Sequence, residues 1–84
     1  MNRRKFLRRL LQSQTNVRFT DLVWMAEGMG FHLDRTRGSH HIFVHPGVPS
    51  PLNLQNVNGE AKPYQVKQFL KLVEEYNLIL SEEE

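Results

Sequence analysis

Three segments of the chain place apolar residues three and four positions apart, the spacing typical of amphipathic helices. The first covers residues 3–12, where arginines occupy the opposite side of the predicted helix. The second begins at Thr20, a favourable N-cap residue, and ends near the glycines of GMG, residues 28–30. The third begins at Pro63, because proline is favoured at the first helical position, and ends near Tyr76.

Between the second and third helices, apolar and polar residues alternate with the period of two that predicts strands. Residues 31–37 and 40–45 flank a Gly-Ser turn and predict a β-hairpin. Residues 46–51, PGVPSP, predict a loop, since proline removes backbone donors from a sheet. Residues 52–55, LNLQ, predict a third strand, and NVNGEA predicts a turn. The predicted fold is α+β, with an α-β-β-β-α core behind an extra N-terminal helix.

Composition limits the chain to one small domain. It has 84 residues, of which 39% are hydrophobic and 24% are charged. The chain has no cysteine, which excludes disulfides and thiolate metal sites and fits a reducing cytoplasm, where we expect the protein. No apolar run approaches the ~20 residues needed to cross a bilayer. We therefore expect no membrane association.

Charge is distributed unevenly, although the formal net charge is only +2. Residues 1–20 contain six basic side chains and no acid, whereas the last eleven residues contain five glutamates and no base. A basic segment attracts polyanions, so the N-terminal segment is a candidate contact to nucleic acid. A solvated helix without a ligand is the alternative. We expect the acidic end of the chain to be a solubilising tail.

Three of the four histidines lie in GSHHIFVH, residues 38–45. A metal site does not explain them, because His40 and His41 are neighbours and point to opposite faces of a strand. His41 and His45 share a face but are separated by about 13 Å of strand. Zinc needs its nitrogen ligands at about 2.0–2.1 Å. We therefore expect no metal and no other cofactor, and we expect Ser39 to be a turn residue rather than a nucleophile, since no third residue orients a base beside it.

Cleavage of RNA by its own 2′-hydroxyl requires little more than a histidine and positive charge. An imidazole, with an ordinary pKa of about 6.5, can move the proton near neutral pH. Basic side chains can stabilise charge on the phosphoryl oxygens, and the candidates are Arg35, Arg37 and Lys62. Many small basic proteins contain such residues, so a structural or solvated role for each histidine stays open.

Alternation along the second strand separates the two central histidines. His40 shares a face with Ile42 and Val44, whereas His41 shares the other face with Phe43. If Ile42 and Val44 face the helices, packing holds His40 at the edge of the core. His41 then lies on the open face beside Phe43, on which an RNA base could stack.

The segment GMGFHLDRTRGSHHIFVHP, residues 28–46, resembles the signature of the HicA family of bacterial toxins. The shared features are a glycine and an aromatic residue at the end of a helix, GSHH at the start of a strand, a following aromatic residue, and His45-Pro46. Residues 59–78, GEAKPYQVKQFLKLVEEYNL, resemble the last segment of the family. The chain departs from the family in about 18 additional N-terminal residues and in a third strand without a histidine.

The resemblance implies a double-stranded-RNA-binding-domain-like α-β-β-β-α fold, with a three-stranded antiparallel sheet packed against helices. It implies a type II toxin that cuts mRNA in a stress response without a metal and that binds a HicB antitoxin. It implies a catalytic histidine in GSHH, for which His40 is the better positional match and His41 the second candidate. The expected RNA contacts are Arg35, Arg37, Ser39, Phe43 and Lys62.

The expected organisation is a basic helical extension over residues 1–18, a HicA-like domain over residues 19–80 and an acidic tail over residues 81–84. Two other functions are compatible with these residues. One is an RNA-binding module that does not cut, and the other is a protein-interaction domain of the same fold. Binding to RNA phosphates must weaken steeply as the salt concentration rises, and this dependence distinguishes RNA binding from a protein-interaction function.

Overall fold

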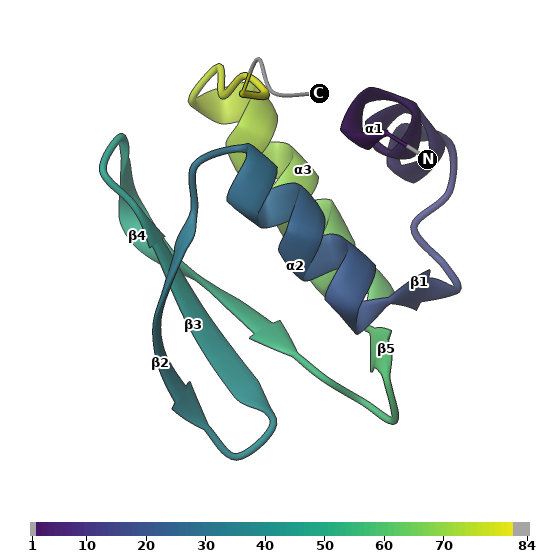
Figure 1. The fold of residues 1–84 in the computed structure, drawn as a ribbon, viewed down its shortest axis with the longest axis vertical. Helices are drawn as coiled ribbons and strands as arrows, with labels where there is room; N and C mark the ends of the chain where they lie inside the picture. The colour runs from purple at the N-terminus through teal and green to yellow at the C-terminus, as the bar shows by residue number, and fades with distance from the viewer. Residues whose placement is uncertain (1, 82–84) are drawn as a thin grey trace.

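The computed structural model describes residues 2–81 (Figure 1). The elements follow in the order α1 (Arg3–Gln12), β1 (Val17–Arg18), α2 (Phe19–Gly28), β2 (His32–Arg37), β3 (His40–His45), β4 (Val48–Gln55), β5 (Glu60–Ala61) and α3 (Pro63–Glu75). The predicted hairpin, third strand and helices are confirmed, as is the α-β-β-β-α order behind an extra helix. The glutamates of the predicted acidic tail, residues 82–84, lie outside the described residues.

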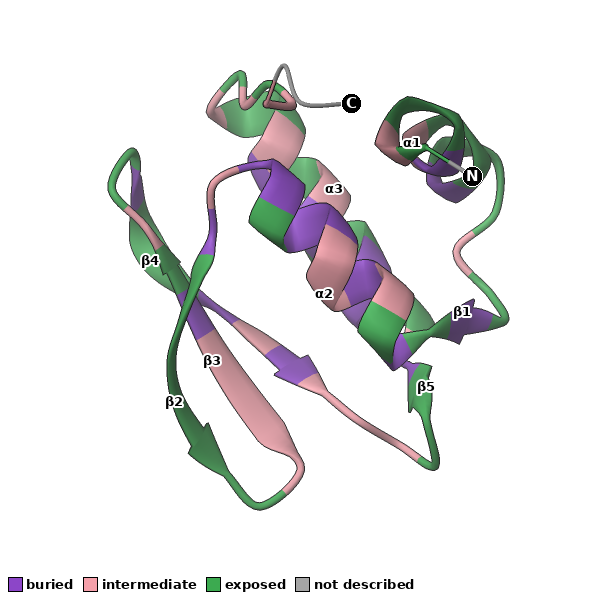
Figure 2. Cartoon of the chain, in the orientation of Figure 1, coloured by how far each residue is buried: buried purple, intermediate pink, exposed green. Residues whose placement is uncertain are grey.

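The main sheet has the order β2-β3-β4, and all its strand pairs are antiparallel. Helices α2 and α3 cover one face of this sheet, and α1 packs on α2 on the far side from the sheet (Figure 1). Among residues 2–81, the opposite face of the sheet carries no helix, and β2 is exposed along its whole length (Figure 2). This uncovered side is called the open face below.

The predicted loop PGVPSP is largely strand, which is a correction. Strand β4 begins at Val48 and includes Pro49 and Pro51. It is an edge strand, so one side of its backbone has no ladder to maintain and proline is tolerated. The register also shifts between the pairs that involve Val48 and Leu52, so both prolines lie in an irregular stretch of the ladder.

A second, two-stranded sheet formed by β1 and β5 was not predicted. Each strand has two residues, too few to show a period of two. Asn58 and Gly59 both have positive φ angles, 53° and 85°, and turn the chain into β5. The backbone N–H of Phe19 donates to the carbonyl of Gly59 at 2.9 Å. This bond positions the start of α2, which begins at Phe19 rather than at the predicted Thr20.

Candidate functional site

The side chains of the central strand β3 face the other way from the arrangement in which Ile42 and Val44 would pack against the helices. Phe43 is only 1% exposed, and it lies opposite Leu52, which is completely buried. Val44 is 39% exposed and points away from the helices. The faces are reversed because the leucines of β4 continue the apolar surface of Phe43, whereas Ile42 lies opposite the polar Asn53. An RNA base cannot reach Phe43 in the core, so the stacking role expected of it does not fit its position.

A β-bulge in β2 brings two arginines onto the open face beside His40. Arg37 lies opposite His40, and Arg35 lies opposite Ile42. The register shifts between Leu33 and Arg35. Strict alternation would place both arginines on the same face as Leu33, but the shift reverses the phase of the strand. Residues directly opposite one another share a face, so both arginines are on the face of His40.

The His40 ring is held on the open face by a side chain of β4. Its Nδ1 lies 3.1 Å from Oδ1 of Asn53. An amide oxygen accepts, so Nδ1 carries the proton and Nε2 holds the lone pair in the neutral ring. Gln55 lies opposite His40 on β4, and its Nε2 donates to Ser39 Oγ at 3.3 Å. His40 is half-buried and lies between Arg37 on one side and Gln55 on the other.

His41 lies on the face that packs against the helices. The centroid of its ring is 4.7 Å from that of Phe19, with 55° between the ring planes. Its Nδ1 donates to the carbonyl oxygen of Ser39 at 3.1 Å. Packing therefore fixes His41 at the edge of the core, the position that His40 would have if Ile42 and Val44 faced the helices.

His45 has both ring nitrogens engaged. Its Nε2 donates to the carbonyl of Met29 at 3.0 Å, and its Nδ1 accepts from the backbone N–H of Gly47 at 2.8 Å. Its ring also packs on that of Phe31 in a T-shaped arrangement, with 5.1 Å between the centroids and 64° between the planes. Gly30 has φ +98°, and a Cβ there would lie 2.9 Å from His45 Nε2. His45 therefore ties the end of α2 to the turn after β3, and no nitrogen remains for catalysis.

The basic candidates differ in their surroundings. Arg35 Nη1 forms an ion pair with Asp34 at 2.6 Å, and both side chains are substantially exposed. Within residues 2–81, no hydrogen bond or ion pair involves the side chain of Arg37. Lys62 lies at the start of α3, where its Nζ is 5.9 Å from the ring centroid of Tyr64. Lys62 is the N-cap residue of α3, which covers the other face of the sheet, whereas Arg35 and Arg37 share the open face with His40 (Figure 1).

Sequence reasoning missed three polar residues that organise the open face. Asn53 and Gln55 alternate with the leucines of LNLQ, and this alternation is a signal for a polar face opposite the apolar one. Gln65 is 2% exposed, and its Oε1 accepts from the backbone N–H of Gln55 at 2.7 Å. Its role depends on the contact between α3 and β4, which the sequence pattern does not show.

The described residues contain no group of three or more histidine, aspartate or glutamate side chains placed to hold a metal ion. No helix between residues 2 and 81 is long and apolar enough to cross a membrane.

Comparison with protein families gives a match that covers most of the chain. The chain matches the family described as HicA toxin of bacterial toxin–antitoxin over residues 19–74. Searches of curated proteins and of solved structures gave no match. The matched segment contains the hairpin, β4 and most of α3, whereas α1 precedes it. Because this segment is well over half of the chain, the protein belongs to the HicA toxin family, which implies a toxin of a toxin–antitoxin system.

Proposed function

We propose that the protein is an endoribonuclease that cuts mRNA on the open face of the sheet, with His40 as the general acid/base. The observation that carries this proposal is the placement of His40 between Arg37 and the strand that holds Asn53. Its Nδ1 is engaged by Asn53, which leaves Nε2 available for proton transfer. Membership of the HicA family agrees with a toxin that acts on RNA.

The RNA itself supplies the nucleophile in this mechanism. Nε2 of His40 accepts the proton of a 2′-hydroxyl, whose oxygen attacks the adjacent phosphorus. The bond from phosphorus to the 5′ oxygen breaks, and that oxygen takes a proton from water or from the imidazolium. The products are a 2′,3′-cyclic phosphate and a 5′-hydroxyl end, and no metal ion is needed. His41 is the second candidate for the proton transfer, since its Nε2 makes no hydrogen bond within residues 2–81.

Positive charge on the open face supports the same chemistry. Arg37 lies opposite His40 and can stabilise the charge that develops on the phosphoryl oxygens. Arg35 lies on the same face, but its ion pair with Asp34 competes with phosphate. Ser39 lies in the turn beside His40 and can contact the RNA backbone.

We propose that residues 19–80 form the nuclease domain, because this range contains the residues of the proposed site. The 1–18 extension then lies outside the catalytic unit, and its exposed arginines and lysine are a further candidate contact to RNA phosphates.

The partner is an antitoxin of the HicB type that covers the open face, and the place of action is the cytoplasm.

The proposal is tested with end-labelled single-stranded RNA in EDTA. Wild-type protein should cut and leave 2′,3′-cyclic phosphates, and His40→Ala should lose about 100-fold or more in rate while RNA affinity stays close to wild type. His32→Ala is the matched control, because His32 lies on the same open face opposite Val44 and outside the site. Undiminished cutting by His40→Ala would transfer the role to His41. Intact RNA with folded wild-type protein would favour an RNA-binding module.

A further inference from the structure

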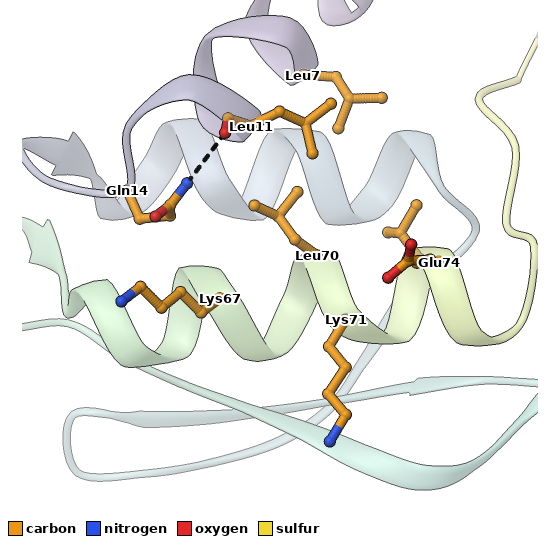
Figure 3. A pocket seen from close by; sticks show the side chains of 8 residues that line it. Leu7, Leu11, Gln14, Lys67, Leu70, Lys71 and Glu74 are labelled. Atoms are coloured by element: carbon orange, nitrogen blue, oxygen red, sulfur yellow. Dashed lines mark hydrogen bonds between the residues drawn. The ribbon is translucent and has the colours of Figure 1, made fainter.

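A groove separates α1 from α3, with α2 behind it (Figure 3). Its volume is about 590 Å³, and its apolar walls are formed by Leu7 and Leu11 of α1 and by Leu70 and Val73 of α3. Figure 3 shows the leucines of the two helices on opposite sides of this groove. Helix α1 precedes residues 19–74, which match the family, so one wall of the groove belongs to the part of this chain outside that match.

The apolar surface continues beyond this groove. A second hollow of about 410 Å³ is lined by Arg4, Leu7, Met29, Leu78, Ile79 and Leu80 and shares Leu7 with the first. Ile79 is 82% exposed and Leu11 is 62% exposed, and they are the two most exposed large apolar side chains of residues 2–81. A continuous exposed apolar surface on a small domain indicates a binding partner.

Cations outnumber acids around the groove. Lys67 and Lys71 lie one turn apart on α3 and line the groove, together with Glu74. Arg4 and Arg8 are also one turn apart on α1, and the helical spacing places them beside the two leucines on the solvent side. A partner that places apolar side chains in the groove therefore meets positive charge along both edges.

The shape and chemistry of the groove favour a protein helix as its occupant. RNA bases bind by stacking on aromatic rings, and no residue that lines the groove is aromatic. A lipid surface is flat, whereas this groove is concave. An amphipathic helix places apolar side chains at i, i+3, i+4 and i+7 into such a groove, and acidic residues beside them would meet the lysines and arginines.

We propose that the groove between α1 and α3 binds an amphipathic helix of the antitoxin, apolar on one face and acidic along its edges. Family membership implies the antitoxin, so the proposal rests on that membership and not on the nuclease mechanism. The open face of the sheet points away from the helices (Figure 1). The groove therefore anchors the antitoxin without itself blocking His40.

The probe is a synthetic helical peptide of about 18 residues, long enough for helix formation. It carries leucines at i, i+3, i+4 and i+7 with flanking glutamates, and a companion peptide carries lysines in place of the glutamates. Fluorescence anisotropy with the full chain should show binding of the acidic peptide about tenfold or more tighter than that of the basic one. Lys67→Glu/Lys71→Glu should reverse this order.

Two further variants separate binding in the groove from general charge attraction. Lys5→Glu/Arg9→Glu makes the same charge change on the opposite side of α1 and should retain the order of the two peptides. Leu11→Gln changes an exposed side chain, so the fold survives, and it should weaken binding of the acidic peptide about tenfold. Circular dichroism checks that each variant is folded.

Equal binding of the two peptides, binding of neither, or an unchanged order in Lys67→Glu/Lys71→Glu overturns the proposal. The proposal is also overturned if the protein does not bind the acidic peptide but binds anionic phospholipid vesicles or RNA in a way that Leu11→Gln weakens. The RNA-cleavage assay is run on the same proteins. RNA cleavage by the wild-type protein alongside failed peptide binding removes the groove proposal alone, whereas peptide binding by the wild-type protein without any RNA cleavage removes the nuclease proposal alone.

Discussion

The Nδ1 atom of His40 lies 3.1 Å from Oδ1 of Asn53, although the two residues are not directly opposite one another in the sheet. Asn53 lies opposite Ile42, one position along the open face from His40. The hydrogen bond is therefore diagonal, and it sets both the tautomer of the imidazole and the direction in which Nε2 points. This arrangement makes Asn53 a positioning residue for the proposed reaction.

Replacement of Asn53 by alanine should lower the rate of RNA cleavage about 10- to 100-fold, because the His40 ring loses the acceptor that orients it. RNA affinity should change little, since no charge is removed. Single-turnover cleavage gives the rate, and anisotropy gives the affinity. Ser50→Ala, an exposed change on the same strand, should cut like wild type. Wild-type cleavage by Asn53→Ala would show that the bond has no catalytic role.

The two arginines of the open face should contribute unequally to RNA binding. Arg37→Ala should weaken binding several-fold and reduce the salt slope by about one, because one phosphate contact is lost. Arg35→Ala should have a smaller effect, since Asp34 already neutralises that guanidinium. Asp34→Asn should release Arg35 and tighten binding. Salt titrations of RNA binding, made in the inactive His40→Ala background, measure the affinity of all three variants. Equal losses of affinity in Arg37→Ala and Arg35→Ala, with no gain in Asp34→Asn, would contradict the unequal contributions of the two arginines.

His45 should matter for stability and not for chemistry. His45→Ala removes two hydrogen bonds and an aromatic contact, and it should lower the free energy of unfolding by about 2 kcal/mol. Urea denaturation measures the loss, with the exposed His32→Ala as control. Cleavage per folded molecule should stay close to wild type. A stable His45→Ala protein that no longer cuts RNA would assign His45 to the reaction instead.

Gln65 should couple α3 to the proposed site. Gln65→Leu fills a similar volume but leaves the backbone N–H of Gln55 without its acceptor, which costs about 1–3 kcal/mol. Hydrogen exchange at the Gln55 amide should accelerate. RNA cleavage should also fall, because Asn53 lies on the same strand, β4. Unchanged exchange at Gln55 would show that another group satisfies this donor.

Much of the fold could be predicted from local pattern. The hairpin over residues 31–45 follows from alternation on both sides of a Gly-Ser turn, and the helix from Pro63 follows from apolar spacing. These features depend on residues a few positions apart. The first half of β4, from Val48 to Pro51, was predicted as a loop because its prolines do not reveal that the strand lies at an edge. The β1–β5 pair was missed because it joins residues more than forty positions apart.

By itself, the sequence determined that His40 and His41 point to opposite faces of a strand, since alternation is a property of any extended backbone. Only the tertiary structure decided which face is covered, because the contact of Phe19 with His41 joins residues distant in the chain. The bulge that brings Arg35 and Arg37 to the face of His40 was likewise decided by pairing with β3. The chemistry of the candidate residues was present in the sequence, but their grouping required the packed sheet.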